Sequence, residues 1–225
     1  MNNLVRENEV RLAREAIKRA GLHLVEKKDL ERLSSDAVAS YEGYPLHDWL
    51  ASGNANGQCD AKTSKLLMYT TLKTMVKDAV IYADSEEMNG FAAWMPFGFS
   101  GTKPLPFMLN GGVGLVMHAG IGFFRRLLSY DEYAMGLKKK FTDHYDWYLF
   151  NLSIKKEAQG RGIASRIMRP MLDFCDDRRM PAYLETNKET NVGLYRLYGF
   201  ELMSEELIPN SPVTHYAMVR RPIEK

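Results

Sequence analysis

The segment Trp147–Met168, WYLFNLSIKKEAQGRGIASRIM, constrains the fold more than any other part of the chain. Six of its first eight residues are aromatic or branched and predict a β-strand that ends at Ile154. A charged turn follows, and from Gly162 onward apolar residues recur at helical spacing. Because Gly160 and Gly162 stand at the strand-to-helix turn, backbone N–H groups can approach an anion there, and the helix dipole favours negative charge. The segment therefore predicts a phosphate cradle in a fold that interleaves strands and helices.

The remaining periodicities predict the other elements of this fold. Helices are expected over 3–20, 30–41, 61–80, 123–140, 162–178 and 190–198, and strands over 22–25, 79–83, 90–95, 147–154, 182–187, 200–208 and 213–219. Residues 41–58 are expected to form an ordered loop with one helical turn. Residues 96–120 hold three prolines and six glycines, so no long element is expected to begin there. The class is α/β (α+β) with one mixed sheet, in a single domain over residues 1–225 with a helical extension over 1–20.

Composition argues against several classes of function. A net charge of +2 is not that of a nucleic-acid-binding surface, and two cysteines cannot build a disulfide framework. The five histidines lie far apart in sequence, so no metal site is expected. The charged N-terminus lacks the features of a secretory signal. The most apolar stretch, residues 111–124, is shorter than the roughly 20 residues that a membrane span needs. We therefore expect a cytoplasmic protein without nucleic-acid or membrane partners.

The glycine turn does not match the common nucleotide-binding patterns. It lacks the lysine of a Walker A loop, and no third glycine stands at the spacing of a dinucleotide-binding fingerprint. The chain also lacks a G-x-S-x-G nucleophile elbow. The glycines over 111–122 are expected to lie in a packed or lid-like apolar segment, and Lys138–Lys140 to be solvated. A glycine-rich turn without a ligand remains an alternative for residues 159–164.

Two motifs in this order resemble those of the GNAT superfamily of N-acetyltransferases. The pattern Q-x-x-G-x-A at Gln159–Ala164, after a strand of the form L-x-x-L-x-I, resembles the acetyl-CoA-binding motif of that superfamily. About 30 residues later, LETNKETNVGLYRLYGF resembles its later motif, in which N-x-x-x-Y lies on a short helix that ends in GF. The residues of both motifs are most similar to those of the branch that includes puromycin acetyltransferase. Residues 1–80 match only in general layout.

The resemblance implies a GNAT fold, a single mixed and mostly antiparallel sheet flanked by helices, here with an extra N-terminal helix. It also implies transfer of acetyl from acetyl-CoA to a primary amine by direct attack in a ternary complex. The pantetheine arm of the cofactor is expected to pair with the strand, and its pyrophosphate to take backbone N–H groups from the turn. The cofactor-binding residues so implied are Leu152, Ser153, Ile154, Gln159, Gly160, Arg161, Gly162, Ile163, Ala164 and Asn191.

Two catalytic residues are expected on the following strand and helix. Asn191 and Tyr195 are four residues apart and share a helix face, and the resemblance implies that Tyr195 protonates the departing thiolate. Tyr198 is the competing tyrosine, whose simpler interpretation is packing at the helix end. Glu185 shares a strand face with Tyr183 and Asn187. Glu185 is either the base that deprotonates the incoming ammonium or a structural carboxylate in a salt bridge or hydrogen bond.

The acceptor site is the least specified part of the sequence. Aromatic and charged residues gather over Tyr41–Trp49, where aromatic faces and a carboxylate would suit a cationic small-molecule amine. Tyr44 and His47 are the expected substrate contacts, whereas Trp49 is expected to pin the loop to the core. The chain is expected to act as a monomer or homodimer. The alternative function is a GNAT-fold module that binds acyl-CoA as a sensor or interaction partner without turnover.

Overall fold

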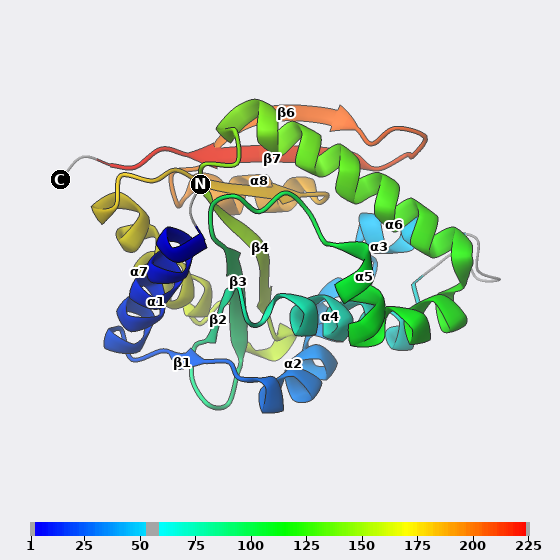
Figure 1. Ribbon diagram of the computed structural model, residues 1–225, viewed down its shortest axis with the longest axis horizontal. Helices are drawn as coiled ribbons and strands as arrows, with labels where there is room; N and C mark the ends of the chain where they lie inside the picture. Colours follow the sequence, from blue (N-terminus) through cyan, green and yellow to red (C-terminus); the bar gives the residue numbers. More distant parts are fainter. Residues whose placement is uncertain (1–2, 53–58, 224–225) are drawn as a thin grey trace.

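The computed structural model describes residues 3–52 and 59–223; the part of the predicted loop at residues 53–58 lies outside this description. Seven strands form one sheet in the order β1-β2-β3-β4-β5-β7-β6 (Figure 1). Only the pair β4–β5 is parallel, and the other neighbouring pairs are antiparallel. The predicted mixed, mostly antiparallel sheet is therefore confirmed.

The boundaries of the elements lie close to the predicted ones over most of the chain. The strands are β1 (His23–Leu24), β2 (Val80–Ala83), β3 (Gly90–Met95), β4 (Trp147–Ile154), β5 (Ala182–Thr186), β6 (Glu201–Leu207) and β7 (Thr214–Arg220). The helices are α1 (Asn3–Arg19), α2 (Leu30–Ala37), α3 (Pro45–Leu50), α4 (Ala61–Met75), α5 (Pro104–Phe107), α6 (Val113–Thr142), α7 (Ile163–Asp177) and α8 (Glu189–Arg196). Short helical turns η1 (Lys27–Asp29), η2 (Val38–Tyr41), η3 (Met108–Gly112) and η4 (Lys156–Ala158) join them.

Helices cover both faces of the sheet, and alternate residues of each strand reach opposite layers. On one face, α1, α7 and α8 pack on side chains that include Trp94, Trp147 and Leu184. On the other face, α2, α4 and the second half of α6 pack on side chains that include Tyr148 and Tyr183. The two layers stand on either side of the sheet in Figure 1. Successive residues along β4, and likewise along β5, therefore pack against different helical layers. This alternation is important at the point where the two strands separate.

The predicted N-terminal helix is confirmed as α1. Val10, Ala13 and Ile17 form its buried stripe, as the spacing predicts, and pack in the same cluster as α7. Glu9 is also buried, and it accepts hydrogen bonds from the guanidinium of Arg178 beyond the end of α7. The helix is thus an integral part of one layer.

The prediction for residues 96–120 is wrong, because α5, η3 and the long helix α6 all begin within them. The whole run Pro104–Thr142 is helical apart from left-handed or extended backbone at Gly111 (φ 136°) and Gly120 (φ 86°). These glycines therefore mark kinks within a helical run. By length and composition alone this run is one that could cross a membrane, with 28% of its most apolar window buried. In its second half, Ala134 and Met135 pack on the sheet.

The expectation that Lys138–Lys140 are solvated is wrong for Lys138. Its side chain is 0% exposed, and its Nζ lies 2.6 Å from Oδ1 of Asp146, which is also 0% exposed. Three consecutive helical residues point about 100° apart and together span about 200°, so one end of the run can reach the inward face when the helix lies on a sheet. Asp146, just before β4, supplies the carboxylate that makes this burial possible.

Candidate active site

The site lies where β4 and β5 separate. Their parallel pairing ends at Leu149 on β4 and Leu184 on β5. One residue later, Phe150 has no partner on β3, because Leu149 pairs with Trp94 and Asn151 with Ala93. Such a bulge bends a strand, and here it coincides with the point at which β4 leaves β5. A cavity of about 770 Å³ is lined by both strands beyond this point.

One side of the cavity is formed by the end of β4 and the start of α7. Leu152, Ser153 and Ile154 line it, and the Ile154 carbonyl accepts hydrogen bonds from Ser40 Oγ and Gln159 Nε2. The nine predicted cofactor-binding residues that line the cavity are Leu152, Ser153, Ile154, Gln159, Gly160, Gly162, Ile163, Ala164 and Asn191. Arg161 is exposed and is not among the lining residues. The structure therefore brings all but one of them together.

The turn before α7 needs its glycines for conformation. Gly160 and Gly162 have φ values of 76° and 77°, in the left-handed region that L side chains rarely adopt. A Cβ at either position would meet no atom within 4 Å, and no side chain caps the start of α7. The first N–H groups of a helix have no partner within it. The turn thus has the conformation, the open space and the donors that the predicted anion cradle requires.

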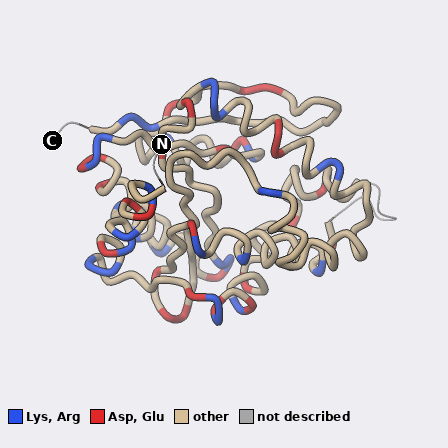
Figure 2. Tube along the Cα trace, in the orientation of Figure 1, with Lys and Arg blue, Asp and Glu red and all other residues tan. Residues whose placement is uncertain are grey.

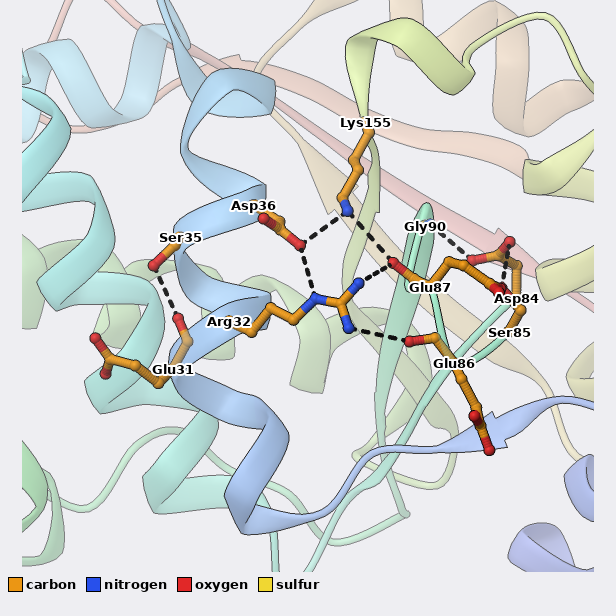
Figure 3. A network of polar contacts seen from close by, with 10 residues as sticks. All are labelled: Glu31, Arg32, Ser35, Asp36, Asp84, Ser85, Glu86, Glu87, Gly90 and Lys155. Carbon is orange, nitrogen blue, oxygen red and sulfur yellow. Dashed lines mark hydrogen bonds and ion pairs between the residues drawn. The ribbon is translucent and has the colours of Figure 1, made fainter.

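A polar network joins the residue after β4 to α2 and to the β2–β3 turn (Figure 3). Lys155, directly after β4, lies 2.8 Å from Asp36 of α2 and donates to the Glu87 carbonyl. Arg32, also on α2, donates to the carbonyls of Glu86 and Glu87 in the β2–β3 turn (Figure 3). Lys155 therefore ties the end of β4 to the helix that leads into Ser40 and Tyr41.

Helix α8 and the turn that follows it place Tyr195 and Tyr198 on the cavity wall. Tyr195 is buried, and its burial raises its pKa above the usual range, so the phenol keeps its proton. Tyr198 is half-buried and its hydroxyl lies 3.1 Å from Ser165 Oγ on α7. Asn191, on the same side of α8, donates from Nδ2 to Thr186 Oγ1 at 3.1 Å. Gly199 caps the end of this helical segment, with φ 84° and the Phe200 N–H bonded to the Tyr195 carbonyl.

Glu185 faces the cavity from the opposite layer of the sheet. Its Oε1 accepts a hydrogen bond from the Tyr148 hydroxyl at 2.6 Å and from the Tyr130 hydroxyl at 3.5 Å. Burial raises the pKa of Glu185, and these hydrogen bonds oppose that rise. His215 Nε2 lies 4.0 Å from Oε2, but burial lowers the pKa of His215 to about 4, so this imidazole is neutral at pH 7. Glu185 thus lies among phenols and not beside a cation.

The buried pair Lys138–Asp146 lies beneath these phenols. Lys138 Nζ is 5.7 Å from the ring centre of Tyr148 and 6.0 Å from that of Tyr183. Burial lowers the pKa of Lys138 and raises that of Asp146, while their mutual attraction opposes both changes. This pair supports the two rings nearest to Glu185 on β4 and β5.

Three residues of this side were not predicted, namely Tyr130, Asp131 and Tyr148. Asp131 lines the cavity, and burial raises its pKa to about 6, although it accepts the Thr102 N–H at 3.2 Å. No spacing in the sequence links α6 to β5. The position of Tyr148 could have been found from the sequence. The two strands begin with similar residues, WYL and AYL, and in the structure these are in register, so that Tyr148 lies beside Tyr183.

The two predicted substrate contacts, Tyr44 and His47, both line the cavity. The Tyr44 hydroxyl accepts the Asn187 N–H at 3.0 Å and lies 3.2 Å from Thr186 Oγ1, at the end of β5 that no longer pairs with β4. His47 stacks on Tyr41 with ring centres 4.6 Å apart, and its Nδ1 is buried without a partner among the described residues. Trp49 does not line this cavity and packs on an apolar cluster, which confirms its predicted role in pinning the segment.

Within residues 3–52 and 59–223, no group of three or more His, Cys, Asp or Glu side chains is placed to hold a metal ion. Cys175 is 0% exposed in the core, and burial raises its pKa above the usual range. The described residues that line the cavity include phenols, the carboxyl groups of Asp131 and Glu185, the Lys188 ammonium and the His47 imidazole.

The sequence of this chain is similar to those of known acetyltransferases. Residues 120–200 match the model of the acetyltransferase (GNAT) family. An uncharacterised N-acetyltransferase of Schizosaccharomyces pombe is 23% identical over 212 residues, which cover 88% of this chain and 82% of the relative.

Solved structures with a similar fold include two N-acetyltransferases. The polyamine N-acetyltransferase of Drosophila melanogaster, which forms N-acetylagmatine, has a TM-score of 0.56 and 13% identity, over 89% of this chain and 98% of that one. An N-acetyltransferase of Staphylococcus aureus Mu50 has a TM-score of 0.54 and 11% identity, over 88% and 98%. These similarities show the GNAT fold. The closer likeness to puromycin acetyltransferases stays a prediction. The family match over residues 120–200, the similarity to an N-acetyltransferase and the fold agree, and together they support an acyltransferase enzyme.

Proposed function

We propose that this protein transfers acetyl from acetyl-CoA to the primary amine of a small molecule, by direct attack within a ternary complex. The observation that carries the proposal is a single cavity that passes between the separated ends of β4 and β5. It has glycine-rich backbone and Tyr195 on one side, and Glu185 among phenols on the other. Such a cavity can hold a thioester and an amine together.

The residues present suit acetyl-CoA, which would supply a thioester carbonyl and a thiolate leaving group. Gly160–Ala164 offer uncapped N–H groups to a pyrophosphate, and β4 beyond Leu149 has an edge free of β5 for an extended pantetheine arm. Asn191 lines the same side, as expected for a cofactor contact, although its amide is engaged by Thr186. The main chain carries most of this recognition.

The two proposed catalytic residues act at opposite sides of the cavity. Glu185 takes a proton from the incoming ammonium, so that the free amine nitrogen forms the new bond to the acetyl carbon. Tyr195 gives its phenolic proton to the sulfur as the carbon–sulfur bond breaks. The nitrogen, now bonded to the acetyl carbon, loses its second proton to solvent, and Tyr195 regains a proton from solvent. Because burial keeps Tyr195 protonated and disfavours the charged form of Glu185, each group has an environment that suits its role. Glu185 returns its proton to solvent after product release.

A fold neighbour acts on polyamines, and another forms acetylagmatine as an agmatine N-acetyltransferase. At 13% and 15% identity these likenesses concern the fold, so the acceptor must be argued from this cavity. The two carboxylates Asp131 and Glu185 and the rings of Tyr41 and Tyr44 favour a cation as the acceptor. A sensor without turnover is the competing function.

A thiol-release assay with acetyl-CoA and a panel of primary amines tests the proposal, with acetyl-CoA affinity measured in parallel by calorimetry. We expect turnover with at least one amine. Tyr195→Phe should lower kcat about 10²- to 10⁴-fold with unchanged acetyl-CoA affinity, because only the proton donor is lost. Tyr198→Phe is the matched control and should retain most activity. Tight cofactor binding without turnover on any amine would favour the sensor, and a large loss in Tyr198→Phe alone would exchange the two tyrosines.

A further inference from the structure

The acceptor side of the cavity ends in an arm lined by apolar side chains. They come from four helices that lie far apart in sequence: Leu46 and Leu50 from α3, Leu67 from α4, Phe107 from α5, and Phe124 and Leu127 from α6. All six belong to a third hydrophobic cluster, separate from the two that cover the sheet. The rings of Phe107 and Phe124 are stacked with centres 6.3 Å apart. We call this set of six residues the apolar arm.

The walls of the apolar arm are held in place. Arg126 on α6 donates from Nε and Nη2 to the Leu50 carbonyl at the end of α3, at 2.9 and 2.6 Å. Two arginines lie between Phe124 and Leu127, and neither lines the cavity: Arg125 is exposed, and the Arg126 guanidinium is bound to a backbone carbonyl of α3. The arm is therefore a built part of the cavity.

Helix α6 fixes the order of charge and apolar surface along the cavity. Phe124, Leu127 and Asp131 recur at three- and four-residue spacing, and all three line the cavity. At a rise of 1.5 Å per residue, Leu127 lies about 6 Å and Phe124 about 10 Å from Asp131 along the helix axis. The apolar lining thus begins about one helical turn from the carboxylate and continues for about another turn.

The arm has no charge to receive a second ammonium. Among the described lining residues the charged ones are Asp131, Glu185 and Lys188, and none of these belongs to the arm. Residues 104–124 contain no Lys, Arg, Asp or Glu, and α5 and the start of α6 are tan throughout Figure 2. His47 lines the cavity beside Leu46, and burial lowers its pKa to about 4, so it is neutral at pH 7. An ammonium in the arm would lose its water without gaining a counter-charge.

From this order we infer that the acceptor is a primary amine with an apolar body, an alkyl or arylalkyl amine whose ammonium lies against Glu185 and Asp131. The body fills the apolar arm. This inference rests on the proposed acetyl transfer and names its substrate class. It excludes a polyamine as the preferred acceptor, because the second charge of a polyamine would lie in the arm.

Steady-state kinetics with matched amines tests the class. Heptylamine and 1,6-diaminohexane have equal length and differ in one terminal group, a methyl against an ammonium. We expect kcat/KM to be at least tenfold higher for heptylamine, and to rise about fourfold per methylene from propylamine until the arm is filled. Equal or higher kcat/KM for 1,6-diaminohexane or spermidine would overturn the substrate class and leave acetyl transfer standing. If no amine is acetylated while acetyl-CoA binds, the proposed function fails, and the class fails with it.

Variants at Leu127 test whether the preference for heptylamine over 1,6-diaminohexane comes from the apolar arm. Leu127→Gln should lower kcat/KM for heptylamine, because it replaces apolar lining with an amide of similar size. Leu127→Glu adds a counter-charge, and relative to Leu127→Gln it should shift the preference toward 1,6-diaminohexane at least tenfold. Leu109→Glu is the control, since Leu109 is 78% exposed and does not line the cavity. The same selectivity in Leu127→Glu and Leu127→Gln would overturn the assignment of the arm.

Discussion

At the cofactor end of the cavity the chain presents mainly backbone from one continuous segment, whereas at the acceptor end it presents side chains from six elements. Residues 152–164 form the first, through a strand edge and two left-handed glycines. The second is assembled from α3, α4, α5, α6, β4 and β5. Backbone recognition depends on conformation and tolerates changes of side chain, but a side-chain cavity changes with each substitution. Substitutions can therefore change which acceptor this cavity binds without changing its binding of the cofactor.

The two ends also differ in buried charge. The cofactor end is formed by exposed or half-buried residues around Gly160 and Gly162. The acceptor end buries the carboxyl of Glu185 and, behind Tyr148 and Tyr183, the ion pair of Lys138 and Asp146. Buried charges are stabilising only while their partners remain. Substitutions at the acceptor end should therefore have the larger effects, and the following experiments test this expectation from the largest effect to the smallest.

Glu185→Gln should have the largest effect on activity. It removes the proposed base and keeps the size of the side chain and its ability to accept a hydrogen bond from Tyr148. We expect kcat to fall about 10²- to 10⁴-fold, with acetyl-CoA affinity unchanged by calorimetry. Activity within about threefold of wild type would make Glu185 a structural carboxylate.

The pH dependence separates this loss from a loss of stability. The pKa of Glu185 is raised, so kcat/KM should fall as the pH drops below that pKa, and this limb should be missing in Glu185→Gln. Asp131, with a pKa of about 6, also titrates in the cavity. Asp131→Asn is the control, because it shows how much of the fall in kcat/KM at low pH comes from Asp131. A carboxyl with a raised folded-state pKa loses folding stability as pH rises from its ordinary range to that pKa. Glu185→Gln should therefore unfold no earlier than wild type at pH 7, measured by thermal melting.

Lys138→Met should give the largest loss of stability. It leaves Asp146 buried without its cation, and breaking a buried pair in this way costs about 3–5 kcal/mol. Since the pKa of Asp146 is already raised by burial, the deficit should shrink as pH falls and Asp146 becomes protonated. Lys138→Met with Asp146→Leu should recover most of the loss in urea unfolding. A single variant as stable as wild type would show that the pair is dispensable.

The contrast between the two ends also explains what could be predicted from the sequence. Glycine at a strand-to-helix turn reports a local backbone conformation, so the cradle and the strand that precedes it follow from adjacent residues. The acceptor end depends on long-range contacts that no local spacing records. Lys138 is buried because it forms an ion pair with Asp146, which is also buried. The start of α6 was missed because Gly114 and Gly122 lower helix propensity, although Leu115 and Phe123 bury enough apolar surface to hold the helix.

Gly162→Val should weaken acetyl-CoA binding at least tenfold, about 1.4 kcal/mol, with a small effect on folding. Space is not the reason, because a Cβ at Gly162 meets no atom within 4 Å. The reason is its φ of 77°, which a branched residue avoids by turning the N–H groups of the cradle away. Gly136→Val is the matched control, since Gly136 lies within α6, where a Cβ also has open space. Unchanged affinity in a folded Gly162→Val variant would remove the cradle from the cofactor site.

His47→Phe should have the smallest effect and tests whether α3 contacts the acceptor or only supports the cavity. Phenylalanine keeps the ring that stacks on Tyr41 and removes Nδ1, which is buried without a partner among the described residues. If Nδ1 bonds the acceptor, the KM for the amine should rise several-fold, because one neutral hydrogen bond contributes about 0.5–1.5 kcal/mol. The KM for acetyl-CoA should not change, and since His47 has a pKa of about 4 the effect should be constant above pH 6. His118→Phe is the control, because His118 contacts Asp60 outside the cavity. An equal rise in both KM values would make His47 part of the scaffold, and α3 would then contribute only its apolar residues Leu46 and Leu50 to the acceptor side.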